Sequence, residues 1–199
     1  MRSSGASPVT PIFYFDLASP EAYLAAERVL QAMPVATEWV PVLARELPAP
    51  ETFDAFRCAE ERASVLESYA ATAKARGLQP LRWPDPFPFD SAHAMRVATY
   101  AKQIGRTVAF ALAAYRQAFA AGRSLEDPDT VLIASAACEM HPAAVRKAAG
   151  LRSIGETLAE ATALAAERGV RDVPAVWTGE RVFHGDADLP RAARALAAA

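Results

Sequence analysis

The stretch Phe13–Val29, FYFDLASPEAYLAAERV, changes from a strand pattern to a helix pattern within a few residues. Serine is a preferred helix N-cap and proline is favoured at the first helical position, so Ser19-Pro20 predicts a helix that starts directly after the strand. The Ser19 hydroxyl would then lie at the positive end of the helix dipole, where an anionic ligand atom is stabilised. The local sequence supports a cap and a ligand-binding group about equally.

The segments around this stretch predict a β-α-β unit. Ile12–Phe15 is an apolar strand, Pro20–Met33 is an amphipathic helix, and a second strand follows at Val35–Val42. A crossover of this kind joins parallel strands, which lie in a largely buried sheet.

The middle of the chain, from Thr52 to Arg168, is rich in alanine and almost free of strand patterns. The Pro-rich segment 78–90, LQPLRWPDPFPFD, is expected to cross this region in an extended form. Between clear breakers the sequence predicts helices at 52–76, 91–105, 107–121, 128–138, 142–149 and 151–168.

The last region returns to strand patterns. Val173–Thr178 and Arg181–Phe183 flank the dipeptide Gly179-Glu180, which predicts a hairpin with a tight turn. Residues 186–196 then predict a closing helix.

This order of elements, β-α-β, helical block and β-β-α, is that of a thioredoxin fold with an inserted helical domain. We therefore expect an α/β fold of this thioredoxin-like kind. Residues 10–48 and 169–199 would form the thioredoxin-like domain, and 52–168 would form the all-helical insertion.

Composition excludes several classes of protein. A chain of 199 residues with 52% hydrophobic residues can bury a full core. A formal net charge of -2 without a basic run argues against nucleic acid as a partner. The N-terminus lacks the apolar segment of a secretory signal, and no apolar run approaches the roughly 20 residues of a membrane helix, so we expect a cytoplasmic protein without membrane contact.

The cysteines and histidines indicate neither a redox pair nor a metal site. Cys58 and Cys138 are far apart, so there is no CxxC motif and no disulfide framework. The three histidines show no metal-ligand spacing with them, so no metal is expected.

Four segments in order resemble the 2-hydroxychromene-2-carboxylate isomerases and the related kappa-class glutathione transferases, a branch of the DsbA-like thioredoxin superfamily. The likeness runs over nearly the whole chain. The segments are FYFDLASPEAYLAAERV, PFPFDSAHAMRVATYAKQIGR, AYRQAFAAGRSLEDPDTV and RGVRDVPAVWTGERVFHGD.

The resemblance implies a catalytic role for Ser19. Ser19 and Ala22 stand where disulfide oxidoreductases of this fold carry the two cysteines of CxxC, so this chain has no thiol of its own there. In the resembling enzymes glutathione supplies the sulfur, held as a thiolate near the serine hydroxyl. A free thiol titrates at about 8.5, and a helix N-terminus with a hydroxyl donor favours its anion.

The resemblance also implies a binding site for the rest of glutathione. Pro174 is expected to follow a cis peptide bond, and the backbone of Val173 would pair with the cysteinyl backbone of glutathione. Gly185 and a nearby Asp would bind the γ-glutamyl end. Because Ala187 stands where that Asp is expected, Asp186 either faces the ammonium of glutathione or caps the closing helix.

The sequence departs from the family pattern a second time, directly after the second strand. The family has a Gly-rich loop and an Asn there, whereas this chain reads PVLARELPAPETF. Arg45, Glu46 and Arg57 are the candidates that could replace the Asn, although a surface arginine is usually only a solvated charge.

Aromatic residues of the Pro-rich crossing predict the substrate cavity. Trp83 and Phe87 would form a wall between the two domains, where ligand sites are common. His184 would either line the cavity from the hairpin or, as is more usual, be a plain surface histidine. A Ser19–His184–Asp16 triad is a weaker interpretation because the sequence has no G-x-S-x-G elbow.

Three functions follow from these observations. The first is a glutathione-dependent isomerase or transferase that acts on a small aromatic substrate: a thiolate adds to a conjugated carbon, permits rotation and is eliminated. The second is a DsbA-like thiol oxidoreductase, which the missing CxxC disfavours. The third is a thiol- or peptide-binding module that kept the fold and lost the chemistry. A homodimer stays open as the assembly.

Overall fold

Four short strands form one mixed sheet in the order β2-β1-β3-β4. The computed structural model describes residues 9–49 and 59–198. The strands are β1 (Ile12–Phe15), β2 (Glu38–Pro41), β3 (Ala175–Trp177) and β4 (Val182–His184). β1 pairs parallel with β2 and antiparallel with β3, and β4 pairs antiparallel with β3. Strands from the first and the last part of the chain, β2 and β3, therefore both pair with β1.

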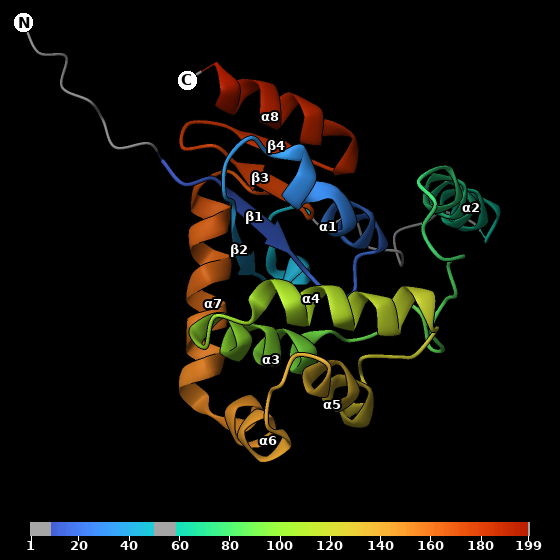
Figure 1. Ribbon diagram of the computed structural model, residues 1–199, viewed down its shortest axis with the longest axis vertical. Coiled ribbons are helices and arrows are strands. Elements are labelled where there is room, and N and C mark those ends of the chain that lie inside the picture. The colour runs from blue at the N-terminus through green and yellow to red at the C-terminus, as the bar shows by residue number, and fades with distance from the viewer. Residues whose placement is uncertain (1–8, 50–58, 199) are drawn as a thin grey trace, which may run out of the picture.

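Helices occupy the chain between the two halves of the sheet and also flank it (Figure 1). In Figure 1, α7 runs along one side of the sheet, and α3 to α6 gather below it. The helices are α1 (Pro20–Ala32), α2 (Ala59–Ala75), α3 (Ala92–Gln103), α4 (Thr107–Tyr115), α5 (Pro128–Ala136), α6 (Pro142–Gly150), α7 (Arg152–Glu167) and α8 (Leu189–Ala197). In the described parts of the chain, none has the length and apolar character needed to span a membrane.

The order of elements confirms the predicted α/β fold, with a helical block between a β-α-β unit and a β-β-α unit. The part of the expected helix 52–76 that precedes Ala59 lies outside the described residues. The division into two domains stays a prediction, because one hydrophobic cluster includes residues of both.

Two helices differ from their predicted form. The expected α-helix at 107–121 changes after Tyr115 into a π turn, Arg116–Ala120. The expected helix at 186–196 begins as a 3-10 turn, Asp186–Asp188. An α-helix that began at Asp186 would need a bond from the N–H of Pro190 to the Asp186 carbonyl, and proline has no N–H to give.

Side chains of the sheet alternate between two faces. Phe13 and Phe15 contact Trp39, with ring centroids 4.9 and 5.8 Å apart, in the cluster that also contains α1, α3, α4 and α8. Ile12 and Tyr14 point to the opposite face and belong to the cluster of α7. The sheet is thus covered on both sides, as the apolar run of β1 predicts.

Phe119 lies at the centre of an aromatic cluster that joins the sheet side of the fold to the Pro-rich crossing. It is fully buried and stacks on Tyr23 of α1 and on Tyr115, with centroids 5.8 and 6.4 Å away. Its other ring partners are Trp83, Phe87 and Phe89, at 6.2 to 6.4 Å. The crossing thus packs through its aromatic side chains.

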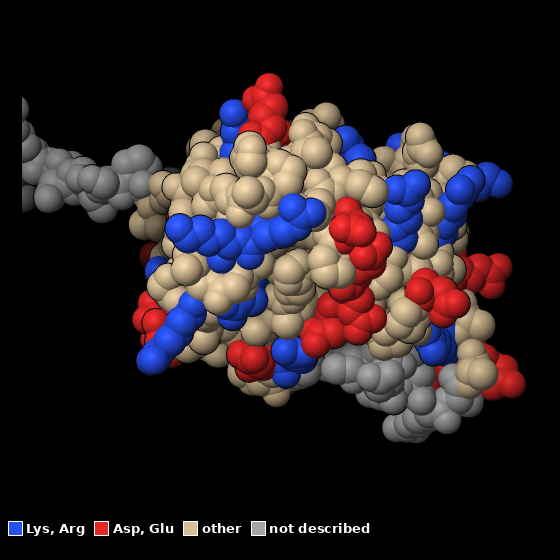
Figure 2. Space-filling view, turned by 90° about the horizontal axis from the view of Figure 1, so that it is seen from below, with Lys and Arg blue, Asp and Glu red and all other residues tan. Residues whose placement is uncertain are grey.

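The face of the molecule that is seen from below in Figure 1 carries charges of both signs. Figure 2 shows acidic and basic side chains side by side over this face. Neither sign dominates it, so this face has no single-sign field that would steer a charged macromolecule.

We predict that Phe119→Ala lowers the free energy of unfolding by about 3–5 kcal/mol, because it opens a cavity among five aromatic rings. Urea unfolding measures the loss. Leu164→Ala on α7 is the control: its side chain is 44% exposed, so the cost should stay within about 0.5 kcal/mol. Equal costs for the two variants would contradict the central place given to Phe119.

Candidate active site

Ser19 caps α1, as the sequence predicts. Its Oγ accepts the N–H of Ala22 at 3.1 Å, and its own N–H donates to the Asp16 carbonyl at 3.1 Å. Pro20 occupies the first turn, where a missing N–H costs nothing. Because a hydroxyl oxygen that accepts one hydrogen bond can still donate its hydrogen, the cap leaves Ser19 able to act on a ligand.

The Val173-Pro174 peptide bond is cis, as predicted. Both residues are buried directly before β3, which pairs with β1 through Tyr14 and Ala175. The Val173 N–H donates to the carboxylate of Asp172 at 2.7 Å. A peptide backbone that paired with Val173 would therefore compete with Asp172 for this N–H.

The turn Gly185–Asp186 links Pro174 to the first turn of α1. The Gly185 N–H donates to the Pro174 carbonyl at 2.8 Å, and the Asp186 N–H donates to Glu21 Oε1 at 2.8 Å. Ser19, Val173, Pro174 and this turn therefore lie together at the end of the sheet where β1 finishes. Nothing in the sequence pattern indicated Glu21 as part of this group.

The Asp186 carboxylate is buried and binds two arginines. Arg28 Nε donates to Oδ1 at 2.9 Å, and Arg76 Nη1 donates to the same oxygen at 3.0 Å. Arg76 Nη2 also binds Oδ2, and Arg28 Nη2 binds the Asp186 carbonyl. The expected role as a helix cap therefore needs correction, because the Asp186 side chain caps neither the 3-10 turn nor α8. Its role opposite the glutathione ammonium stays a prediction, in which the ammonium would compete with two guanidinium groups for the carboxylate.

Asp16 is a buried acid that sequence reasoning used only in the weak triad. Its Oδ1 accepts the N–H of Ala18 and its Oδ2 that of Ala44, both at 2.9 Å. Burial raises the pKa of the Asp16 carboxyl, while the hydrogen bonds from Ala18 and Ala44, the hydroxyl of Ser91 and the charge of Arg45 oppose the rise. The sequence signal that could have indicated Asp16 is an acidic residue directly after an apolar strand.

His184 is separated from the triad and from the predicted cavity. Its Nε2 accepts the Arg171 N–H at 3.0 Å, while Asp16 is bonded elsewhere, so no triad forms among these residues. Burial and then the charge of Arg171 lower the pKa of His184, which favours the neutral acceptor, while Asp188 opposes the shift. By strand alternation His184 shares the face of Val182, in the α7 cluster.

Trp83 and Phe87 lie in the other cluster and contact each other, with ring centroids 5.2 Å apart. Both are half-buried, and Arg62 of α2 lies over the Phe87 ring at 5.8 Å. The predicted cavity is therefore corrected: these two aromatic residues belong together, and His184 does not join them. Their role as a substrate wall stays a prediction.

The loop after β2 brings a charged pair towards the same end of the sheet. Arg45 donates to Asp90 Oδ1 at 2.9 Å, and both side chains are exposed. Glu46 is exposed as well, and Arg57 lies outside the described residues. A replacement of the family's Asn by one of these residues stays a prediction.

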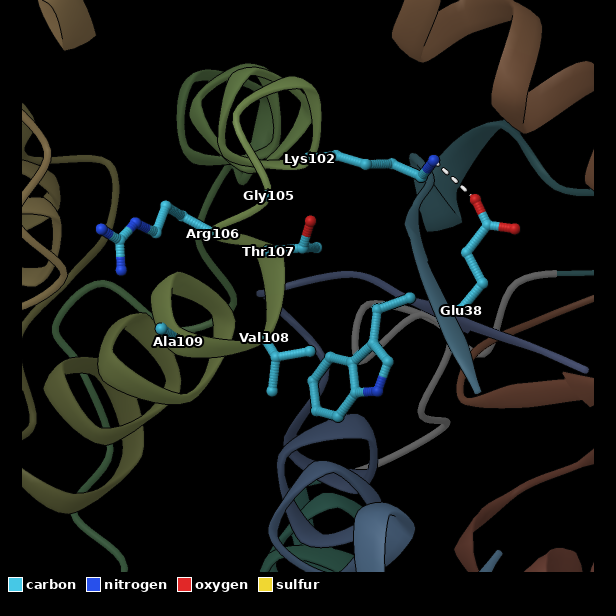
Figure 3. A pocket seen from close by; sticks show the side chains of 8 residues that line it. Glu38, Lys102, Gly105, Arg106, Thr107, Val108 and Ala109 are labelled. Carbon is cyan, nitrogen blue, oxygen red and sulfur yellow. Dashed lines mark ion pairs between the residues drawn. The ribbon is translucent and has the colours of Figure 1, made fainter. Parts of the chain in front are cut away.

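A hollow of about 520 Å³ lies at the opposite end of the strands (Figure 3). It is lined by Glu38, Trp39, Lys102 and residues 105–109. Figure 3 shows Lys102 and Glu38 turned toward each other, in an ion pair of 2.6 Å. Glu38 starts β2 and pairs with Ile12 at the start of β1, so this hollow is remote from Ser19.

The family model of the DsbA-like thioredoxin domain matches residues 11–197. No curated protein matched the sequence. Among solved structures, 2-hydroxychromene-2-carboxylate isomerase gives a TM-score of 0.82 at 18% identity, over 96% of this chain and 95% of that chain. A probable DsbA oxidoreductase from Streptomyces coelicolor gives 0.78 at 20% identity, over 95% and 88%.

A third similar structure is that of the cytosolic disulfide reductase DsbM from Pseudomonas aeruginosa with GSH. Its TM-score is 0.65 at 17% identity, over 95% of this chain and 96% of that chain. At these identities the structural likeness shows the fold.

We predict that Asp16→Asn makes the free energy of unfolding less sensitive to pH. The folded protein binds the Asp16 proton more tightly than the unfolded chain, in which Asp titrates near about 3.9. The contribution of Asp16 to stability is therefore fully present below that value and is lost as pH rises through the raised pKa. Urea unfolding at a series of pH values should show wild type losing more stability than Asp16→Asn.

Asp127 provides the control of opposite sign. Hydrogen bonds from Asp129 and Thr130 lower the pKa of Asp127, so its contribution is present above the unfolded value near about 3.9 and is lost as pH falls. Asp127→Asn should remove that loss at low pH. If the free energy of unfolding of Asp16→Asn changed with pH as much as that of wild type, burial would not dominate the titration of Asp16.

Proposed function

This chain belongs to the family of DsbA-like thioredoxin domains, and we propose that it is an enzyme that holds a small external thiol at Ser19 and uses it on a small aromatic substrate. The observation that carries this proposal is a serine cap, with no thiol at either CxxC position, beside a cis proline. A protein with this arrangement needs a thiol from outside for sulfur chemistry.

The chemistry of Ser19 supports the proposal. At the start of α1 a sulfur atom meets the positive end of the helix dipole and a hydroxyl whose oxygen is already fixed by the Ala22 N–H. Both effects favour the thiolate over the thiol. The bound thiol supplies a nucleophile that can add to a conjugated carbon and leave again without net oxidation. Ser19 holds the sulfur and itself forms no bond to the substrate.

The finer proposal is a glutathione-dependent, 2-hydroxychromene-2-carboxylate isomerase-like enzyme or a kappa-type transferase. The sequence resemblance supports it, and the description of DsbM with GSH makes glutathione the reference thiol. Trp83 and Phe87 are the aromatic residues that we expect to meet the substrate. Since DsbM is described as cytosolic, we expect action in the cytoplasm.

A binding module without turnover is the second candidate. The observation that favours it is the use of the whole Asp186 carboxylate in internal ion pairs, which removes a group expected to hold glutathione. An oxidoreductase is less well supported, because Cys138 is buried and burial raises the pKa of its thiol, with the charge of Arg106 in opposition. A turnover assay with an aromatic substrate and added thiol would distinguish an enzyme from a binding module.

We predict that two variants of Ser19 separate capping from thiol binding. Ser19→Ala removes the cap, at about 1 kcal/mol, and also removes the donor to sulfur. Ser19→Asp keeps a good N-cap but places a negative charge where the sulfur should be anionic. Ser19→Asp should therefore melt near wild type, raise the pKa of bound glutathione measured by ultraviolet thiolate absorbance, and lose most turnover.

The matched control for the cap is Asp127→Ala, because the Asp127 side chain caps α5 through the Asp129 N–H. This variant should lower stability in the same direction as Ser19→Ala and leave thiol ionisation unchanged. If both Ser19 variants bound and ionised the thiol like wild type, Ser19 would be a cap only.

A further inference from the structure

We propose that Tyr115 and Met95, two fully buried side chains of the helical block, are positioning residues that hold the Ser19 hydroxyl in place for a bound thiol. The inference rests on the proposed thiol site at Ser19 and names the groups that control it. Both side chains act through the loop 16–19, which joins β1 to α1, and form no bond to the thiol themselves.

The N–H groups of residues 17–19 in this loop are all bonded within the protein. The Leu17 N–H donates to Met95 Sδ of α3 at 3.2 Å. The Ala18 N–H donates to Asp16 Oδ1 at 2.9 Å, and the Ser19 N–H donates to the Asp16 carbonyl at 3.1 Å. A different loop shape would leave buried N–H groups without partners, which is costly. The contact with Met95 therefore helps to select one shape of the loop.

The Tyr115 hydroxyl holds the carbonyl to which Ser19 is bonded. It donates to the Asp16 carbonyl oxygen at 2.9 Å, and the same oxygen accepts the Ser19 N–H. A carbonyl oxygen has two lone pairs, so these two donors together satisfy it. Because Tyr115 is fully buried at the end of α4, its hydroxyl acts on the loop and not on a ligand.

Tyr115 keeps its hydrogen in the folded protein. Burial, and after it the charge of Asp16, raises the pKa of Tyr115 well above its usual value. A free thiol titrates at about 8.5, so Tyr115 stays a donor over the whole range in which a thiol ionises. A titration of the bound thiol therefore reports on the sulfur and not on this tyrosine.

The end of α4 also fixes α1 itself. Tyr115 packs on Tyr23 of α1, with ring centroids 5.9 Å apart. Arg116, the next residue, binds Glu27 of α1 through two N–H groups at 2.7 and 2.8 Å. Arg116 begins the π turn, and π turns within helices are frequent at functional sites. The helix that carries Ser19 therefore cannot shift relative to Tyr115 without breaking these contacts.

A fixed loop matters because Ser19 can favour a thiolate only in the right orientation. Ser19 Oγ already accepts the Ala22 N–H at 3.1 Å, which limits the directions in which its hydrogen can point. A loop that loosens lets the hydroxyl turn from the sulfur, and the thiolate then loses a donor that was oriented in advance. Loss of the Tyr115 or Met95 contact should therefore raise the pKa of the bound thiol while the fold persists.

Two conservative variants test the inference, with glutathione as the thiol. Tyr115→Phe removes only the hydroxyl, and Met95→Leu replaces the sulfur acceptor by a side chain of similar volume. Each variant should raise the pKa of bound glutathione, read from ultraviolet thiolate absorbance, by about half a unit. That shift is about threefold in the equilibrium between thiol and thiolate, which is the size expected for one lost hydrogen bond.

Tyr14→Phe is the matched control, because it also removes a buried tyrosine hydroxyl close to Asp16 in sequence. The Tyr14 hydroxyl accepts from Arg168 of α7 at 2.8 Å, on the other face of the sheet. This variant should keep the wild-type pKa of bound glutathione. Tyr115→Phe in a Ser19→Ala background should cause no further change in that pKa if the effect passes through Ser19.

The inference is supported if both loop variants raise the pKa of bound glutathione, Tyr14→Phe does not, and the effect of Tyr115→Phe disappears in the Ser19→Ala background. It is overturned if the loop variants melt at a lower temperature but leave that pKa unchanged, because the contacts would then serve stability alone. An undiminished effect in the Ser19→Ala background overturns it as well, and both of these results leave the proposed thiol site intact.

Failure of the proposed function looks different. If wild type did not bind glutathione, or bound it without lowering its thiol pKa, the proposed function would fail and the inference with it. Melting curves identify the folded variants, and Met95→Leu decides the result if Tyr115→Phe does not fold.

Discussion

The buried carboxylate of Asp16 fixes the start of α1 relative to the rest of the fold. It binds the Ala44 N–H in the loop after β2, while the Asp16 carbonyl accepts from the Tyr115 hydroxyl at 2.9 Å and from the Ser19 N–H. Residues far apart in sequence are thereby held around one short loop. Because this loop carries Ser19, the hydroxyl is oriented before any ligand arrives, which is the condition for selective stabilisation of a developing charge.

The same end of the sheet has two parts with different chemistry. At Ser19 a helix start and a hydroxyl favour an anion. At the Gly185–Asp186 turn, Glu21 and two arginines already satisfy the polar groups. Buried ion pairs of this kind are costly to break, because removing one partner leaves a charge without compensation. The fold thus leaves the Ser19 hydroxyl at a helix start, while the polar groups of the neighbouring turn are bonded within the chain.

The sequence allowed prediction of features that depend on neighbouring residues. The Ser19 cap and the hairpin turn at Gly179-Glu180 follow from a few adjacent residues, and both were confirmed. The cis bond at Pro174 followed from a family motif. The environment of Asp186 could not be predicted, because Arg76 lies 110 positions away and only the folded chain brings the two together. Strand alternation could have placed His184 with the α7 face, apart from Trp83 and Phe87.

The most direct test of the account is the position of a bound sulfur atom. Crystals soaked with glutathione and measured for anomalous sulfur scattering should show a peak within hydrogen-bonding distance of Ser19 Oγ that none of the chain's own four methionines and two cysteines accounts for. A soaked crystal whose ligand sulfur lies away from Ser19 would contradict the account.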